Sequence, residues 1–184
     1  ALMGMSKPMV FDGVDDYVDC GNDSSLQLTG AMTVSMWGQL SGASDSTQYT
    51  LGAKDAAWKG WAFIRNTSNK IIFYTETGSP SNLQDLATST STITDSNWHH
   101  YVGTFPADGS TGCKVYIDGA DVTSHSGATI SAMTESGANM QIGKSPRSSD
   151  NEWQGNINEV SIWSAALSLA EVQELFNDGV ALDA

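Results

Sequence analysis

Short runs in which apolar and polar side chains alternate recur along the whole chain. Clear examples are residues 33–37 (TVSMW) and residues 114–118 (KVYID). A period of two places the apolar side chains on one face of an extended strand, which is the pattern of a half-buried β-strand. Turn-forming sequences such as Asn66–Asn69 and Asp108-Gly109 separate the runs. We therefore predict an all-β fold, a two-sheet antiparallel sandwich of the jelly-roll type.

Residues 168–179 (SLAEVQELFNDG) break this pattern and predict one short C-terminal helix. Ser168 and Glu171 have the spacing of a capping box, in which each side chain binds a backbone amide of the other residue's turn. Gly179 can adopt the left-handed conformation that ends many helices. The apolar side chains predicted to share one face are Val172, Leu175 and Phe176. We expect this face to dock on the sandwich.

Charge limits the kinds of partner that the chain can bind. Lys and Arg total 8 against 21 Asp and Glu, which gives a net charge of -13. Such a balance excludes nucleic acid and anionic membrane surfaces as partners, because both are themselves negatively charged. It suits a cation, a neutral ligand such as a sugar, or simple solubility. No segment reaches the length of about 18 apolar residues that membrane insertion requires.

The 184 residues fit one domain, which we place at residues 9–180. Residues 1–8 lack the apolar region of a signal peptide, and we expect them to be partly left over from cloning or disordered. Cys20 and Cys113 do not have the C-x-x-C spacing of a zinc or redox site. They fit two partly buried thiols, and a single bridge between them stays open.

Three separated motifs resemble those of one family. They are MVFDGVDDYVDCGNDSSLQLTGAMTVSMW (residues 9–37), DSNWHHYVGTF followed by GCKVYIDGADV (residues 95–122), and IGKS followed by EWQGNINEVSIWSAALSLAEVQELFNDG (residues 142–179). Together they resemble the laminin G-like domains of the concanavalin A-like lectin/glucanase superfamily. The resemblance covers nearly the whole chain. It implies two stacked antiparallel sheets, one concave and one convex, and pairing of the first strand with the GNINEVSIW strand (residues 155–163) on the convex sheet.

The same resemblance implies a structural calcium ion near the aspartates of the first motif. Many members hold calcium through positions that correspond here to Asp12 and Asn158, and Asp15 or Asp16 could add negative charge. Calcium prefers six to eight hard oxygen ligands, and Asn158 in place of the commoner Asp should weaken binding. Alternatively, the aspartates are turn and edge residues of what looks like the first hairpin, where they form tight turns and prevent aggregation.

Catalysis is not expected. Hydrolases of this superfamily carry Glu-x-Asp-x-x-Glu on one strand, which aligns the acid and the nucleophile on one face. None of the glutamates begins that pattern: Glu76, Glu135, Glu152, Glu159, Glu171 and Glu174. His99 and His100 should face opposite sides of a strand, one packed and one exposed, so they should not bind one metal ion together.

A ligand site is predicted in the loops around two tryptophans. Sugars stack on flat aromatic faces and receive hydrogen bonds from a polar rim. Trp58 lies in a polar, glycine-flanked loop and Trp61 begins a strand, so we take both as candidates, with Asp55 and Asn82 as polar partners. Trp58 could instead be a partly buried plug. The loops expected to rim the same end are residues 42–48, 76–84 and 144–153.

The sequence therefore favours a non-catalytic carbohydrate-binding or adhesion module that binds a glycan or a protein. We expect it to be extracellular or associated with a cell or virion surface, as part of a larger multidomain protein. A structural protein-interaction domain is the first alternative, and a polysaccharide-acting hydrolase is the second. Fold alone does not decide among them, because this fold carries many functions.

Overall fold

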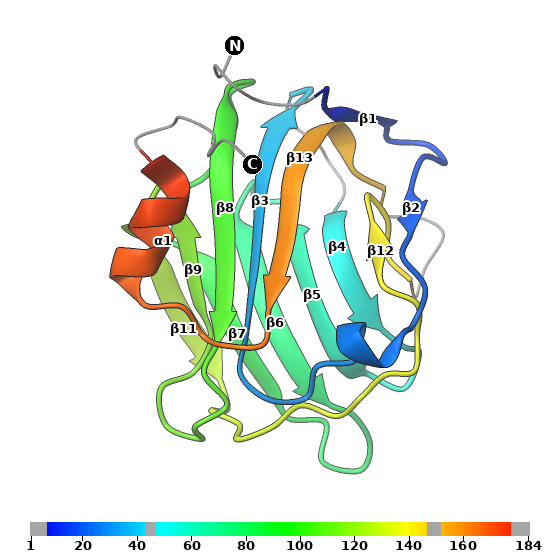
Figure 1. Ribbon diagram of the computed structural model, residues 1–184, viewed down its shortest axis with the longest axis vertical. Coiled ribbons are helices and arrows are strands. Elements are labelled where there is room, and N and C mark those ends of the chain that lie inside the picture. The colour runs from blue at the N-terminus through cyan, green and yellow to red at the C-terminus, as the bar shows by residue number, and fades with distance from the viewer. Residues whose placement is uncertain (1–6, 43–46, 147–151, 178–184) are drawn as a thin grey trace.

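The computed structural model describes residues 7–42, 47–146 and 152–177. As predicted, two antiparallel sheets form a jelly-roll sandwich (Figure 1). In spatial order, the six-stranded sheet contains β1 (Met9–Asp12), β13 (Gln154–Trp163), β3 (Met32–Leu40), β8 (Trp98–Phe105), β9 (Lys114–Ile117) and β10 (Ala120–Asp121). The seven-stranded sheet contains β11 (Thr123–Gly127), β7 (Gln84–Ser89), β6 (Ile71–Thr77), β5 (Lys59–Arg65), β4 (Gln48–Lys54), β12 (Gln141–Ile142) and β2 (Val18–Asp19). A short 3-10 turn, η1 (Ser24–Leu26), follows β2.

The main core lies between the two sheets and takes alternate side chains from each strand. Trp61, Phe63 and Phe73 enter it from the seven-stranded sheet, and Met36 and Tyr101 enter it from the six-stranded sheet. All five are at most 1% exposed. Burying a large apolar side chain contributes roughly 1.5–3 kcal/mol, so this layer dominates the stability of the sandwich.

The first strand pairs with the last, as the family resemblance implies. Met9 lies opposite Ile157 and Asp12 lies opposite Gln154. The expectation that residues 9–21 form a hairpin is wrong, because β2 pairs with β12 in the other sheet. Phe11 anchors β1 in the core, and the chain then turns at Gly13 and crosses to the seven-stranded sheet.

The predicted helix is α1 (Leu169–Phe176), and its capping box is present. The Ser168 amide donates to Glu171 Oε2 at 2.7 Å, and the Glu171 amide donates to Ser168 Oγ at 3.4 Å. Val172 packs with Val102 and Tyr116 on the outer side of the six-stranded sheet, so the helix docks as expected (Figure 1). The left-handed residue that ends the helix is Asn177 rather than Gly179, which lies outside the described residues.

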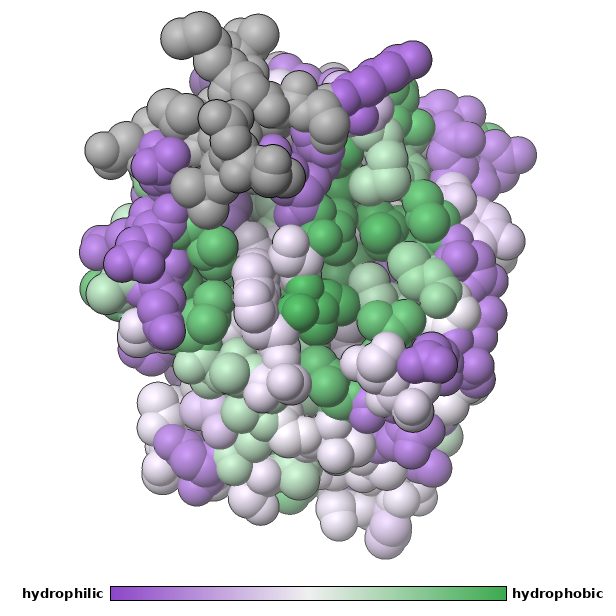
Figure 2. Space-filling view, viewed as in Figure 1, coloured by the Kyte–Doolittle hydropathy of each residue, from purple (hydrophilic) through white to green (hydrophobic). Residues whose placement is uncertain are grey.

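Figure 2 shows the face on which α1 lies. Apolar side chains gather over β13 and on the side of it toward β12, and hydrophilic side chains lie along the left and right edges of this face.

Cys20, which is half-buried, and Cys113, which is buried, are both free thiols, so no bridge joins them. Within the described part of the chain, no helix has the length and apolar character needed to cross a bilayer.

Candidate functional site

A pocket of about 300 Å³ opens on the seven-stranded sheet, where the β4–β5 and β6–β7 hairpins turn. The described residues that line it are Trp58, Glu76, Asn82 and Gln84. Trp58 comes from the first hairpin and the other three come from the second. The pairing of β5 with β6, in which Gly60 lies opposite Glu76, brings the two hairpins together.

Local turn chemistry presents Trp58 at the mouth of the pocket. Asp55 Oδ1 accepts hydrogen bonds from the amides of Ala57, at 2.8 Å, and Lys59, at 3.1 Å, which closes the turn. Trp58 has φ 61°, a left-handed conformation that is unusual for a bulky residue. Its side chain is 46% exposed. Asn82, also left-handed at φ 45°, faces it from the other hairpin.

A buried ion pair adjoins the pocket through Glu76, which lines it. The Lys54 ammonium contacts the Glu76 carboxylate, and the two residues are 1% and 4% exposed. Lys54 Nζ also lies 3.3 Å from the Tyr74 hydroxyl and 4.5 Å from the centre of the Trp58 ring. Gln84 Nε2 donates to Glu76 Oε1 at 2.7 Å. These contacts hold the Trp58 ring over a neutralised charge pair, with a cation–π attraction to its face.

The structure brings together two of the four predicted ligand-binding residues, Trp58 and Asn82. Asp55 stabilises the turn and does not line the pocket. The prediction for Trp61 is wrong, because its side chain is 1% exposed and belongs to the main core. Trp61 lies opposite Thr75, and that position on β5 points between the sheets rather than outward.

Of the three loops expected to rim one end, only residues 76–84 adjoin Trp58. The loops at residues 42–48 and 144–153 adjoin strand ends near the start of β4, at the opposite end of that strand from the turn that carries Trp58. Antiparallel strands reverse direction at every turn, so the β3–β4 connection and the β4–β5 turn must lie at opposite ends of β4. Residues 43–46 and 147–151, within those two loops, are outside the described residues.

Sequence reasoning missed the ion pair beneath the ring. A weak signal exists in β6, because Ile72, Tyr74 and Glu76 alternate with core residues and so share the outward face. That pattern places Glu76 on the face of the sheet that points away from the main core. It does not reveal that Glu76 forms an ion pair with Lys54, which lies on β4, two strands away.

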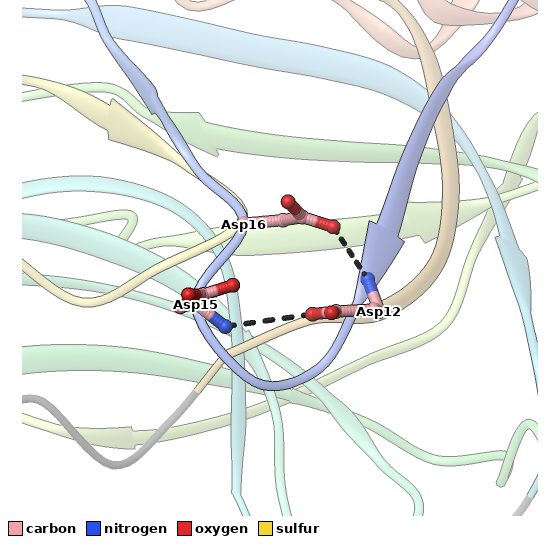
Figure 3. A group of neighbouring side chains, drawn as sticks. All are labelled: Asp12, Asp15 and Asp16. Atoms are coloured by element: carbon pink, nitrogen blue, oxygen red, sulfur yellow. Dashed lines mark hydrogen bonds between the residues drawn. The ribbon is translucent and has the colours of Figure 1, made fainter.

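Asp12, at the end of β1, clusters with Asp15 and Asp16 of the turn that follows, and all three are exposed (Figure 3). One carboxylate oxygen from each lies within 4.8 Å of the other two. The Asp12 amide donates to Asp16 Oδ2 at 3.0 Å, and Asp12 Oδ1 accepts from the amides of Val14, at 2.8 Å, and Asp15, at 3.4 Å. Carboxylate oxygens suit calcium in kind, although backbone carbonyls or water would have to complete the usual six to eight ligands.

The structure does not bring Asn158 into this group. Asp12 lies opposite Gln154, and Asn158 is four residues further along β13, which corresponds to about 13 Å of strand. Asn158 is buried opposite Trp37 of β3.

The two adjacent histidines serve separate structural roles. His99 Nδ1 lies 2.7 Å from Asp118 Oδ2 and His99 Nε2 lies 3.1 Å from Asp95, and the hydrogen bond to Asp118 is the main cause that raises the pKa of His99. The ring of His99 lies near that of Tyr101, whereas the ring of His100 stacks on Phe176 of α1, so the two histidines face opposite sides of β8, as predicted. His99 is half-buried, however, rather than exposed. Burial lowers the pKa of His100 to about 4. His100 Nε2 lies 2.7 Å from Ser35 Oγ, but both residues are buried, which prevents a substrate from reaching this pair.

The two stacked antiparallel sheets place the chain in the class of jelly-roll sandwich domains. The chain belongs to the concanavalin A-like lectin/glucanases superfamily, and the laminin G-like family model matches residues 12–173. No curated protein sequence matches the chain.

Several solved structures share the fold at low sequence identity. The CBM40 of the Ruminococcus gnavus IT-sialidase has a TM-score of 0.71 and 9% identity, over 94% of this chain and 96% of that chain. The binding domain of botulinum neurotoxin DC, solved in complex with SialylT, has a TM-score of 0.69 and 12% identity, over 94% of this chain and 44% of that chain. The native heptameric SAP-like pentraxin from Limulus polyphemus has a TM-score of 0.58 and 14% identity, over 87% and 80%. At these identities the likeness defines the fold.

Proposed function

We propose that this chain is a non-catalytic carbohydrate-binding module and that the Trp58 pocket is its site. The observation that carries the proposal is a half-exposed tryptophan held over a pocket with polar walls. A sugar ring offers one apolar face that can stack on the indole, while its hydroxyls bond to neighbouring amides and carboxylates. Asn82, Gln84 and Glu76 provide those groups.

The size of the pocket and the solved structures support the same proposal. A pocket of about 300 Å³ is at the lower end of the range for small-ligand sites, which suits one sugar ring and part of a second. The CBM40 of the Ruminococcus gnavus IT-sialidase, which shares the fold, was solved with sialyllactose. The module would act in adhesion, outside or on the surface of a cell or virion, within a larger protein.

The test is glycan-array binding of the wild-type chain and a Trp58→Ala variant. We expect binding to at least one glycan and a loss of about 30-fold or more in affinity for the variant, because a central aromatic contact is typically worth at least 2 kcal/mol. Tyr17→Ala is the matched control, since Tyr17 is 47% exposed but lies outside the pocket. Equal losses in the two variants would contradict the proposal. Silence across the array would favour the protein-interaction alternative.

We also propose that Asp12, Asp15 and Asp16 hold a structural calcium ion that stabilises the turn after β1. Support comes from the three carboxylates within 4.8 Å of one another. At a calcium concentration a hundred times Kd, binding should raise Tm by about 5–10 °C for a chain of this size. The measurement is thermal melting in chelator and in millimolar calcium.

An Asp15→Asn/Asp16→Asn variant should lose most of this shift. Asp108→Asn is its control, because Asp108 is an exposed turn residue outside the cluster. No calcium-dependent shift in the wild-type chain, or an unchanged shift in the double variant, would rule out calcium at this turn.

A further inference from the structure

We infer that the Trp58 pocket selects neutral sugars and rejects glycans that end in an acidic sugar. The inference rests on the proposed function and concerns the chemical class of its ligand. It departs from what the sialyllactose-bound structural neighbours would suggest, and its argument comes from the charges in this pocket.

A carboxylate ligand binds most strongly where a cation lies within reach. Arg or Lys side chains normally supply it through charge-assisted hydrogen bonds. The described residues that line this pocket provide an aromatic ring, two amides and one carboxylate, that of Glu76. None of these four residues carries a positive charge. A sialic acid or uronic acid bound there would therefore find no cation among these four residues to pair with its carboxylate.

Lys54 lies beneath the pocket but cannot meet this need. Its side chain is 2% exposed and its ammonium already contacts the Glu76 carboxylate. The rings of Trp58 and Tyr74 each lie 4.5 Å from Lys54 Nζ and further enclose it. A ligand carboxylate that displaced Glu76 from Lys54 would leave a buried carboxylate without its cation. Breaking a buried pair in this way is strongly unfavourable.

A neutral sugar meets no such opposition. Its hydroxyls can donate to Glu76 and accept from the Asn82 and Gln84 amides, since each hydroxyl both donates and accepts. The net charge of -13 adds to the discrimination, because an anionic ligand must also approach through a negative field.

The experiment compares matched glycans on one array and then in solution. Each pair shares a core and differs only in a terminal acidic group, such as lactose with α2,3-sialyllactose, or a neutral oligosaccharide with its uronic-acid form. We expect the acidic member to bind at least about tenfold more weakly than its neutral partner. Tighter, Trp58-dependent binding of acidic members would overturn this inference and leave the proposed function intact. An absence of binding to any glycan would overturn the proposed function and this inference with it.

A rim variant tests whether the missing cation is the cause. Asn82→Lys places an ammonium at the exposed edge of the pocket, and Asn82→Gln is the uncharged control, which lengthens the side chain by one methylene. We expect the ratio of acidic to neutral binding to rise about tenfold in Asn82→Lys and to stay constant in Asn82→Gln. Circular dichroism checks that both variants fold. An unchanged ratio in a folded Asn82→Lys protein would overturn the charge argument.

Discussion

Trp61→Ala is expected to lower the free energy of unfolding by about 3–5 kcal/mol. Its indole is 1% exposed and lies in the main core, with its ring centre 6.4 Å from that of Phe73. Truncating such a side chain loses its transfer free energy and leaves a cavity that the surrounding sheets fill only in part. Urea unfolding followed by tyrosine and tryptophan fluorescence or by circular dichroism measures the loss, and the m-value should stay nearly constant.

Trp58→Ala is the matched comparison, three residues earlier in the same segment. Because Trp58 is 46% exposed, we expect its removal to change the free energy of unfolding by less than about 1 kcal/mol. Binding and stability should therefore separate, with Trp58 governing the first and Trp61 the second. A loss in Trp58→Ala as large as that in Trp61→Ala would identify Trp58 as a plug of the fold and contradict the proposed site.

Asp85→Ala is the second substitution with a large expected effect, about 3–5 kcal/mol of unfolding free energy. Asp85 is 0% exposed and joins three separate segments. It accepts from the amides of Cys113, at 2.7 Å, and Ile130, at 3.3 Å, and its Oδ1 lies 2.9 Å from His125 Nε2. Alanine leaves both amides without their acceptor, and each buried unsatisfied donor costs about 1–3 kcal/mol.

Asp108→Ala is the control for this prediction. Asp108 Oδ1 also accepts hydrogen bonds from two backbone amides, those of Ser110, at 2.8 Å, and Thr111, at 2.7 Å. Asp108, however, is exposed. Water can replace the lost bonds there, so the loss should be much smaller than for Asp85→Ala. Denaturant unfolding of both variants under one buffer condition makes the comparison. Similar losses would show that burial of Asp85 is not what makes it important.

Elements governed by short-range rules could be predicted from the sequence. The alternation in residues 33–37 falls in β3, the alternation in residues 114–118 covers β9 and the residue after it, and the capping box at Ser168 begins α1 as predicted. These features depend on residues a few positions apart, so local sequence is sufficient to reveal them. The pairing of β1 with β13 came from the family resemblance, because no local signal specifies a partner so distant in the chain.

The failures share a physical cause, which is that the partner of a strand depends on the whole fold. Residues 9–21 have the alternation of two strands, but only tertiary pairing sends β1 and β2 to different sheets. The burial of β5 hides its alternation, since every residue from Gly60 to Arg65 is buried on one side of the sheet or the other. Periodicity therefore could not show that Trp61 faces the core.

By itself, the sequence determined the two-sheet sandwich, the docked helix and a ligand candidate at Trp58. Tertiary structure alone decided that Glu76 and Gln84 meet Trp58, that Lys54 lies neutralised below them, and that Trp61 is core. Alternation and capping act over a few residues, whereas the pocket depends on the register between hairpins. A shift of one residue in that register would turn Glu76 to the opposite face of the sheet, and the pocket would lose its acidic wall.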